Sequence, residues 1–167
     1  VNTAAITSSS SNLCAGDTRS LTGAPVGGTW SVVSGPGSVA GSTLSAIGAG
    51  TVTVAYSISG CSVTQDIEIS PSPTITSSTA AMCVGDTRSL TGAPVGGTWS
   101  VISGPGSVAG STLSATSNGI VTVEYSASGC SITQAIAIKP SPLITSSSAA
   151  ICAGETRTLT GAPVGGT

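Results

Sequence analysis

The chain has 167 residues, of which only four are Lys or Arg and six are Asp or Glu, so its net charge is −2 at neutral pH. Four scattered cations do not make the basic patch that nucleic-acid binding needs, and the absence of histidine excludes a Ser-His-Asp catalytic arrangement. With 39% hydrophobic residues and abundant Thr and Val, the composition favours β structure over disorder.

Two short strands are expected in the first part of the chain. The segment TRSLT predicts a strand around Leu21. After the turn GAPVGG (23–28), Trp30 and Val32 alternate with Ser31, which predicts a second strand. Gly and Pro favour turns in this stretch and in those that follow.

Two longer strands are expected next, joined by a hairpin. Residues 51–59 read TVTVAYSIS, in which Val, Tyr and Ile alternate with Thr, Ala and Ser. This period of two is typical of a strand with one buried face. The dipeptide Ser59-Gly60 predicts the hairpin turn into CSVTQDIEI, which alternates again. Short strands with regular Gly/Pro turns, and no helical spacing, predict an all-β sandwich or barrel.

Proline-rich joints follow these strands, SPSP at 70–73 and KPSP at 139–142. Because proline fixes φ and lacks the amide hydrogen, such joints favour an extended and fairly stiff connector. The next segments, TSSTAA (76–81) and TSSSAA (145–150), are compatible with a first strand or with a serine-rich loop.

A repeat of 69 residues organises the whole sequence. Residues 14–82 and 83–151 differ at only 15 of 69 positions, which is typical of tandem repeats. Cysteines recur with this period at Cys14, Cys83 and Cys152, and at Cys61 and Cys130.

The repeat predicts three units: 1–72, 73–141 and an incomplete 142–167. The third copy reaches Thr167 where the pattern calls for tryptophan, so we expect an unfinished domain in a piece of a longer array. Alternatively, residues 143–167 complete a sheet of a neighbouring chain. No apolar run approaches the roughly 18 residues that a membrane span needs.

Each repeat carries the pattern Cys-x-Gly-[Asp/Glu]-Thr, Leu-Thr, Gly-Gly-Thr-Trp-Ser, then Gly-x-Val-Thr-Val-x-Tyr and Gly-Cys. Its positions are filled by Cys14, Trp30, Tyr56 and Cys61, and again by Cys83, Trp99, Tyr125 and Cys130. This pattern resembles the bacterial Ig-like repeats of large cell-surface adhesins and fibre proteins, including those of gliding bacteria that use type IX secretion. The resemblance implies tandem immunoglobulin-like β-sandwiches at the bacterial cell surface.

Five cysteines in such a chain predict an oxidising compartment. The preferred pairing is within a repeat, Cys14 with Cys61 and Cys83 with Cys130, which leaves Cys152 unpaired. Each bridge would close a loop of about 48 residues. The rival pairing, Cys61 with Cys83 and Cys130 with Cys152, would join neighbouring repeats. A metal site is not expected, since the chain has neither CxxC nor histidine.

The aromatic residues Trp30, Tyr56, Trp99 and Tyr125 are expected to fill the cores, although the tryptophans could instead be exposed platforms that stack on sugars.

The charged residues point to no chemistry. Asp66 and Glu68 share a strand face, but the second repeat has Ala135 and Ala137 there, so we expect a solvated surface. An acid and an arginine recur two residues apart in each copy, as in Asp86 and Arg88, and are expected to form a structural ion pair or a turn cap rather than a calcium site. No catalytic, cofactor-binding or metal-binding residue is assigned, and no enzyme activity is expected.

The leading hypothesis is therefore a structural extracellular repeat that forms a stalk or filament segment of a large bacterial surface protein. Its partners would be neighbouring repeats of the same long chain or further copies of itself. The alternative is an adhesin module that binds glycan or a surface polymer, which an exposed aromatic or loop patch would favour.

Overall fold

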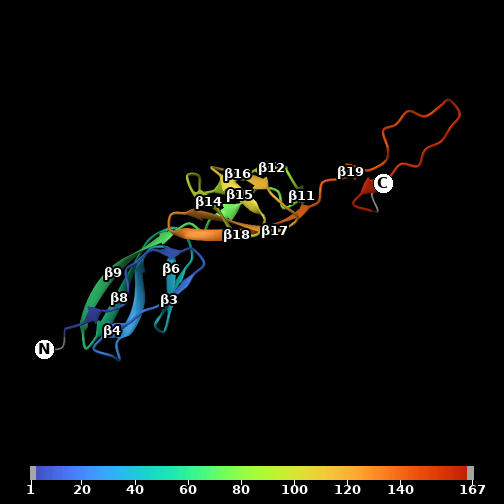
Figure 1. Cartoon of the computed structure of the whole chain (residues 1–167). Coiled ribbons are helices and arrows are strands. Elements are labelled where there is room, and N and C mark those ends of the chain that lie inside the picture. The colour runs from blue at the N-terminus through green and yellow to red at the C-terminus, as the bar shows by residue number, and fades with distance from the viewer. Residues whose placement is uncertain (1–2, 165–167) are drawn as a thin grey trace. The chain divides into compact units, whose positions relative to one another are not determined.

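The computed structural model describes residues 3–164, which form strands joined by turns (Figure 1). The chain divides into two compact units. One unit comprises Val1–Thr76, Gly92–Thr98 and Tyr125–Ile132, and the other Ser77–Thr91, Trp99–Glu124 and Thr133–Thr167. In the part of the chain that is described, no helix is long and apolar enough to cross a membrane.

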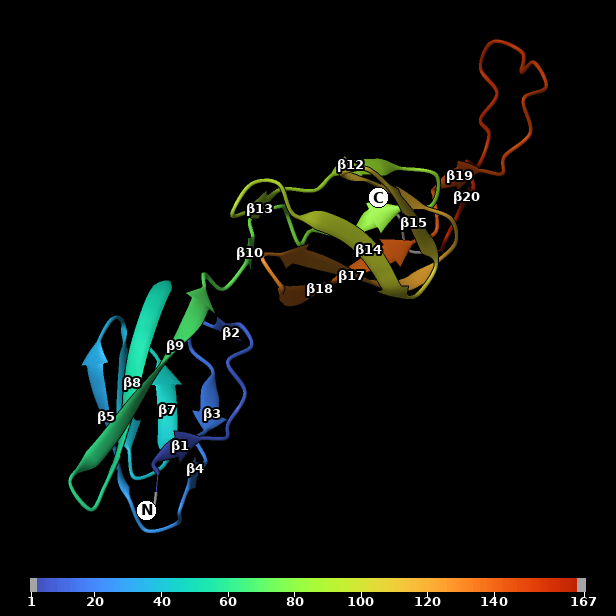
Figure 2. The same ribbon diagram turned by 90° about the vertical axis from the view of Figure 1, so that its left-hand side faces the viewer.

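The first repeat is a two-layer sandwich. Its strands are β1 (Ala5–Ile6), β2 (Leu13–Cys14), β3 (Thr18–Ser20), β4 (Gly23–Ala24), β5 (Thr29–Ser34), β6 (Gly37–Ala40), β7 (Thr43–Ala46), β8 (Gly50–Ile58) and β9 (Cys61–Ser70). One sheet has the order β2-β9-β8-β5 and the other β3-β7-β6, while β1 pairs with β4. Figure 2 shows β5, β8 and β9 on one side and β3 and β7 across from them.

The core of the first repeat lies between these sheets and follows the expected alternation. Val52 and Val54 of β8 and Ile67 of β9 are fully buried, because alternate side chains of a strand point to the same face. Leu44 of β7 meets them from the other sheet. The predicted strands at 51–59 and from Cys61 onward are confirmed.

The second repeat has the same strands in the same order. They are β10 (Thr74–Ile75), β11 (Met82–Cys83), β12 (Thr87–Ser89), β13 (Gly92–Ala93), β14 (Thr98–Ser103), β15 (Gly106–Ala109), β16 (Thr112–Ala115), β17 (Gly119–Ala127) and β18 (Cys130–Lys139). Its sheets are β11-β18-β17-β14 and β12-β16-β15, with β10 on β13. The buried core contains Met82, Leu90, Leu113, Ala115, Val121, Val123, Ile136 and Ile138.

The segments beyond the proline joints settle one open alternative. A two-residue strand, β10, precedes a loop over 76–81, so this serine-rich segment is a loop. In the third copy, β19 (Leu143–Ile144) pairs with β20 (Gly161–Ala162), as β10 pairs with β13. The side chains of Leu143, Ile144 and Leu159 are largely exposed, so the described part of this copy has strand pairing without a core. Residues 165–167 lie outside the described part.

The expected all-β sandwich fold is confirmed by the strand content and the two-layer packing of both complete repeats. The proposed boundaries at 72 and 141 stay predictions.

Candidate functional site

A disulfide between residues of two different sequence repeats is the main candidate feature. Cys14, the last residue of β2, is bonded to Cys130, the first residue of β18, across a sequence separation of 116. Their Cα atoms are 5.9 Å apart, inside the usual range for a disulfide. Both residues belong to the first compact unit.

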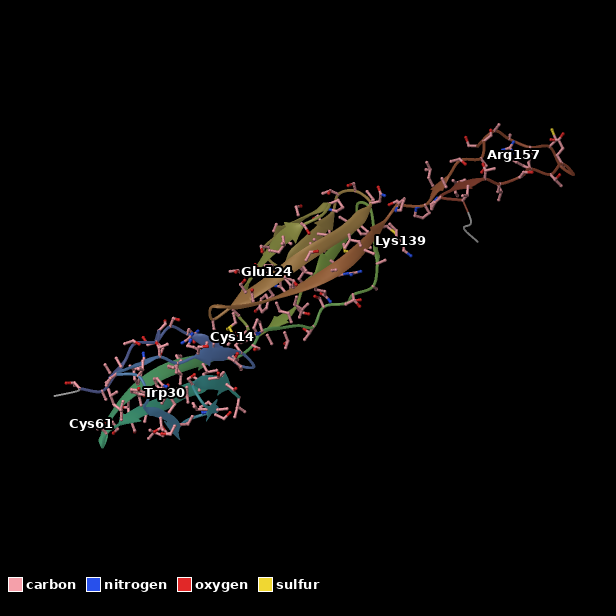
Figure 3. The ribbon with its side chains drawn as sticks, turned by 90° about the horizontal axis from the view of Figure 1, so that it is seen from below. Cys14, Trp30, Cys61, Glu124, Lys139 and Arg157 are labelled. Atoms are coloured by element: carbon pink, nitrogen blue, oxygen red, sulfur yellow. A yellow bond between two sulfur atoms is a disulfide. The ribbon has the colours of Figure 1, made fainter. Side chains whose placement is uncertain are left out.

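The predicted pairing of Cys14 with Cys61 and of Cys83 with Cys130 is therefore wrong. Strand β2 pairs in parallel with β9, and Cys14 lies opposite Ser70, the last residue of β9. Cys61 is the first residue of that ten-residue strand. At about 3.3 Å per residue the two ends of β9 are roughly 30 Å apart, far beyond the reach of a disulfide. Figure 3 shows Cys14 and Cys61 at opposite ends of the first repeat.

The rival pairing within the chain is also wrong, because Cys61, Cys83 and Cys152 are free thiols. The prediction that Cys152 is unpaired stays a prediction. Cys61 and Cys152 are exposed, while Cys83 is partly buried.

Polar contacts surround the bridge. The Asn12 side-chain amide donates to the Ser128 carbonyl at 2.9 Å and to the Ser70 hydroxyl at 2.6 Å. Ser128 and Gly129 both have positive φ, 52° and 80°, as the two central residues of a tight hairpin turn require. This turn presents the Ser128 carbonyl to Asn12 beside Cys130, so the disulfide and the hydrogen bond hold the same hairpin.

The proline joint is tied to the segment that carries Cys14. The Ser72 hydroxyl of the joint donates to the Ala15 carbonyl, and the Ala15 amide donates to the Ser70 carbonyl at 2.9 Å. The second repeat repeats this, with Ser141 donating to the Val84 carbonyl. The joint is therefore anchored at the end of the repeat that carries Cys14.

The GAPVGG turn is shaped by a buried tyrosine. The Tyr56 hydroxyl donates to the Pro25 carbonyl and accepts from the Gly28 amide at 2.9 Å. Trp30 packs on the ring of Tyr56 with the centroids 4.7 Å apart. Tyr56 is buried, whereas Trp30 is half-buried against the edge of the core.

The same arrangement recurs in the second repeat. The Tyr125 hydroxyl donates to the Pro94 carbonyl and accepts from the Gly97 amide at 3.0 Å. Tyr125 is buried, and Trp99 is half-buried against the core. Each tryptophan thus combines a core-facing part with an exposed part.

A shallow concavity of about 590 Å³ lies beside the GAPVGG turn of the first repeat. Its lining includes Trp30, Tyr56, Thr22, Thr29, Ser42 and Val26. Aromatic and hydroxyl side chains on a glycine-rich turn are groups that a small polar ligand can contact.

The recurrent acid and arginine have separate structural tasks. The Asp86 carboxylate accepts from the Cys83 amide at 2.9 Å and thus caps a turn. The Arg88 guanidinium donates to the carbonyls of Ser78 at 3.0 Å and Ala80 at 2.6 Å in the serine-rich loop. Arg157 makes the equivalent contacts in the third copy, with the carbonyls of Ser147 and Ala149.

The paired acids of β9 lie on an exposed strand face. Asp66 accepts from the Thr53 hydroxyl at 2.7 Å and Glu68 from the Thr51 hydroxyl at 2.8 Å, each across the strand pair. Over residues 3–164, no group of three or more His, Cys, Asp or Glu side chains is placed to hold a metal ion.

Neither a protein-family model nor a curated protein matches the sequence. Among solved structures, the chain is similar to a C-terminal 282-residue fragment of intimin, at 18% identity and a TM-score of 0.48 over 70% of this chain. The match spans 52%, about half, of that fragment.

Two further similarities are to domains 4 and 5 of the S-layer protein SbsC and to immunoglobulin domains 1–4 of Sidekick-1. The first has 12% identity and a TM-score of 0.32 over 71% of this chain and 80% of SbsC domains 4 and 5. The second has 15% identity and a TM-score of 0.35 over 84% of this chain and 49% of the Sidekick-1 chain. With TM-scores below 0.5 and identities of at most 18%, these similarities carry no argument about the role of this chain.

Proposed function

We propose that the chain is a structural extracellular segment of a large bacterial surface protein, in which successive immunoglobulin-like repeats form a stalk or filament. The observation that carries this proposal is the Cys14–Cys130 bond, which joins residues of two sequence repeats. Disulfides persist in oxidising compartments, which supports an extracellular location. The hydrogen bonds that tie each proline joint to its own repeat are compatible with a structural role.

The bridge changes how tension would pass along such a stalk. Tension that enters before Cys14 and leaves after Cys130 runs through the disulfide, because that covalent path is far shorter than the 116-residue path through the chain. The residues between the two cysteines, which include the whole core between β7, β8 and β9, then carry no tension. A bridged stalk keeps its length even when a sandwich unfolds.

Single-molecule force extension tests this proposal, with handles attached before Val1 and after Thr167. The reduced chain should release about 400 Å more contour length than the oxidised chain, since 116 residues extend by roughly 3.3–3.6 Å each. The C14S/C130S double variant should behave like the reduced chain under oxidising conditions. Equal extension with and without reductant would contradict the proposal.

The alternative function, a module that binds glycan or a surface polymer, is favoured by one observation. The concavity beside the GAPVGG turn offers Trp30 together with the hydroxyls of Thr29 and Ser42. Screening the chain against a glycan array tests it, with T29V and S42A as variants that remove only hydroxyls. Binding that both variants weaken would favour the adhesin function, and absence of binding would remove it.

A further inference from the structure

The first cysteine of each copy opens a turn of the same geometry, and we call Cys14, Cys83 and Cys152 the entry cysteines. In each copy, the amide of the acidic residue three positions later donates to the cysteine carbonyl. The pairs are Asp17 with Cys14 at 3.0 Å, Asp86 with Cys83 at 3.0 Å and Glu155 with Cys152 at 3.1 Å. Only Cys14 of the three is bonded to another cysteine, so the turn is built into the repeat and does not depend on the disulfide.

Cys14 and Cys83 also share their strand pairing. Cys14 lies opposite Ser70 and Cys83 opposite Lys139, which are the last residues of the ten-residue strands β9 and β18. The amide of the residue after each cysteine donates to the carbonyl of that opposite residue, at 2.9 Å in both repeats. Cys83 therefore occupies in the second repeat the position from which Cys14 makes its bond.

The other cysteine of each repeat lies at the opposite end of the same strand. Cys61 is the first residue of β9 and Cys130 the first residue of β18, and we call them the hairpin cysteines. The turns before them have nearly the same backbone, with φ of 50° and 79° in the first repeat and 52° and 80° in the second. Since a ten-residue strand is roughly 30 Å long, an entry cysteine cannot reach the hairpin cysteine of its own repeat.

The disulfide is the connection that every copy has the residues to make. The hydrogen bond from Asn12 to the Ser128 carbonyl, by contrast, is particular to the first copy. The equivalents of Asn12 are Ala81 and Ala150, whose side chains have no donor. The cysteines recur at every equivalent position from Cys14 onward, so the bond follows the 69-residue period and the hydrogen bond does not.

We infer that the Cys14–Cys130 bond is one of a series, in which the entry cysteine of every repeat is bonded to the hairpin cysteine of the repeat that follows it. Cys83 then pairs with the hairpin cysteine that the period places in the third repeat, after Thr167. The inference deepens the proposed function and rests on it, because it cross-links each pair of neighbouring repeats in the stalk. Each bond forms as two thiols lose two protons and two electrons to a small-molecule disulfide, such as oxidised glutathione, which becomes two thiols.

Such a series would limit the length of the stalk under tension. A covalent path can cross the Cys14–Cys130 bond, follow the chain to Cys152 and cross the bond of that residue in turn. Cys152 follows Cys130 by 22 residues, which span at most about 75 Å when fully extended. Without the bonds, two 69-residue repeats extend to roughly 470 Å. The stalk therefore keeps a short covalent path even when every sandwich unfolds.

The test completes the third repeat by extending the full chain after Thr167 with a copy of residues 99–141, in a C61S/C152S background. Four cysteines then remain, namely Cys14, Cys83, Cys130 and the copied hairpin cysteine, and four cysteines allow three pairings. Cleavage after arginine separates them onto four segments, 1–19, 20–88, 89–157 and the segment from 158 onward. Non-reducing peptide mapping of the oxidised monomer should find 20–88 bonded to the last segment and 1–19 bonded to 89–157.

The control is the same extended chain with serine in place of the copied cysteine. Cys83 should react with a maleimide in the unfolded, unreduced control and should not react in the test chain. Segment 20–88 left unbonded in the test chain, or bonded to 89–157 or to 1–19, would overturn the inference. If 20–88 is unbonded while 1–19 stays bonded to 89–157, only the series fails. The proposed stalk then still rests on the Cys14–Cys130 bond, which force extension tests separately.

Discussion

Tyr56 and Gly28 are in contact through both the ring and the hydroxyl of the tyrosine. The Gly28 amide donates to that hydroxyl at 2.9 Å, and a Cβ placed on Gly28 would lie 2.5 Å from the ring carbon Cζ. Real Cβ atoms do not approach so closely, so only glycine lets the turn close over the ring. The second repeat has the same relationship between Tyr125 and Gly97.

The Gly28→Ala substitution should therefore destabilise the first repeat. The added methyl group would meet both the ring of Tyr56 and the Ser57 carbonyl, which is backbone and cannot move aside. Overpacking of this kind costs about 1–3 kcal/mol of unfolding free energy. Urea unfolding followed by tryptophan fluorescence measures it.

Gly48→Ala is the matched control for this substitution. A Cβ there would make only an ordinary contact with Pro36 at 3.7 Å, and the second repeat has Ser117 at the equivalent position. Its unfolding free energy should stay within about 0.5 kcal/mol of the original chain. Equal losses from both alanines would refute the packing argument.

The Leu44→Ala substitution should cost more, because Leu44 is fully buried between the two sheets of the first repeat. Truncation of a buried leucine to alanine typically costs about 2–5 kcal/mol, from lost burial and from the cavity that remains. Thermal unfolding measures this loss of stability. Val26→Ala is the control, because Val26 is 91% exposed and its truncation should leave the stability nearly unchanged.

The Arg19→Lys substitution should loosen the loop that leads to Cys14. The guanidinium donates to the carbonyls of Ser11 at 2.6 Å and Asn12 at 3.0 Å, from two different nitrogens. A lysine keeps the charge but has no fork of donors, so it cannot hold both carbonyls. Hydrogen exchange should become faster over residues 8–13 while the equivalent loop at 77–82, held by Arg88, serves as an internal reference. Unchanged exchange in the first loop would mean that the arginine contacts do not order it.

Much of the fold could be predicted because it depends on local patterns. The period of two in 51–59 places Val52 and Val54 in the core, and the near-identity of the copies transfers every strand of one repeat to the next. The short strand β1 and the parallel pairing of β2 with β9 have no such signal, since two-residue strands are too short for an alternation to be seen.

The predicted cysteine pairing is wrong because spacing in the sequence says nothing about which end of a sandwich a residue occupies. Cys61 follows the Ser59-Gly60 turn and begins the long strand β9, so the sequence does place Cys61 at one end of the sandwich. The position of Cys14 depends on its parallel pairing with the far end of that strand, a contact between residues 56 positions apart. The role of Gly28 escapes prediction for a similar reason, because the tyrosine beneath it comes from another strand.

The pairing of Cys14 is the central claim, and a peptide map under non-reducing conditions tests it most directly. In the C152S chain, cleavage after arginine yields segments 1–19, 20–88 and 89–157, which carry Cys14, then Cys61 with Cys83, then Cys130. The structure predicts that 1–19 stays bonded to 89–157 until reductant is added. Finding 1–19 bonded to 20–88 instead would contradict the bridge and, with it, the stalk that the bridge reinforces.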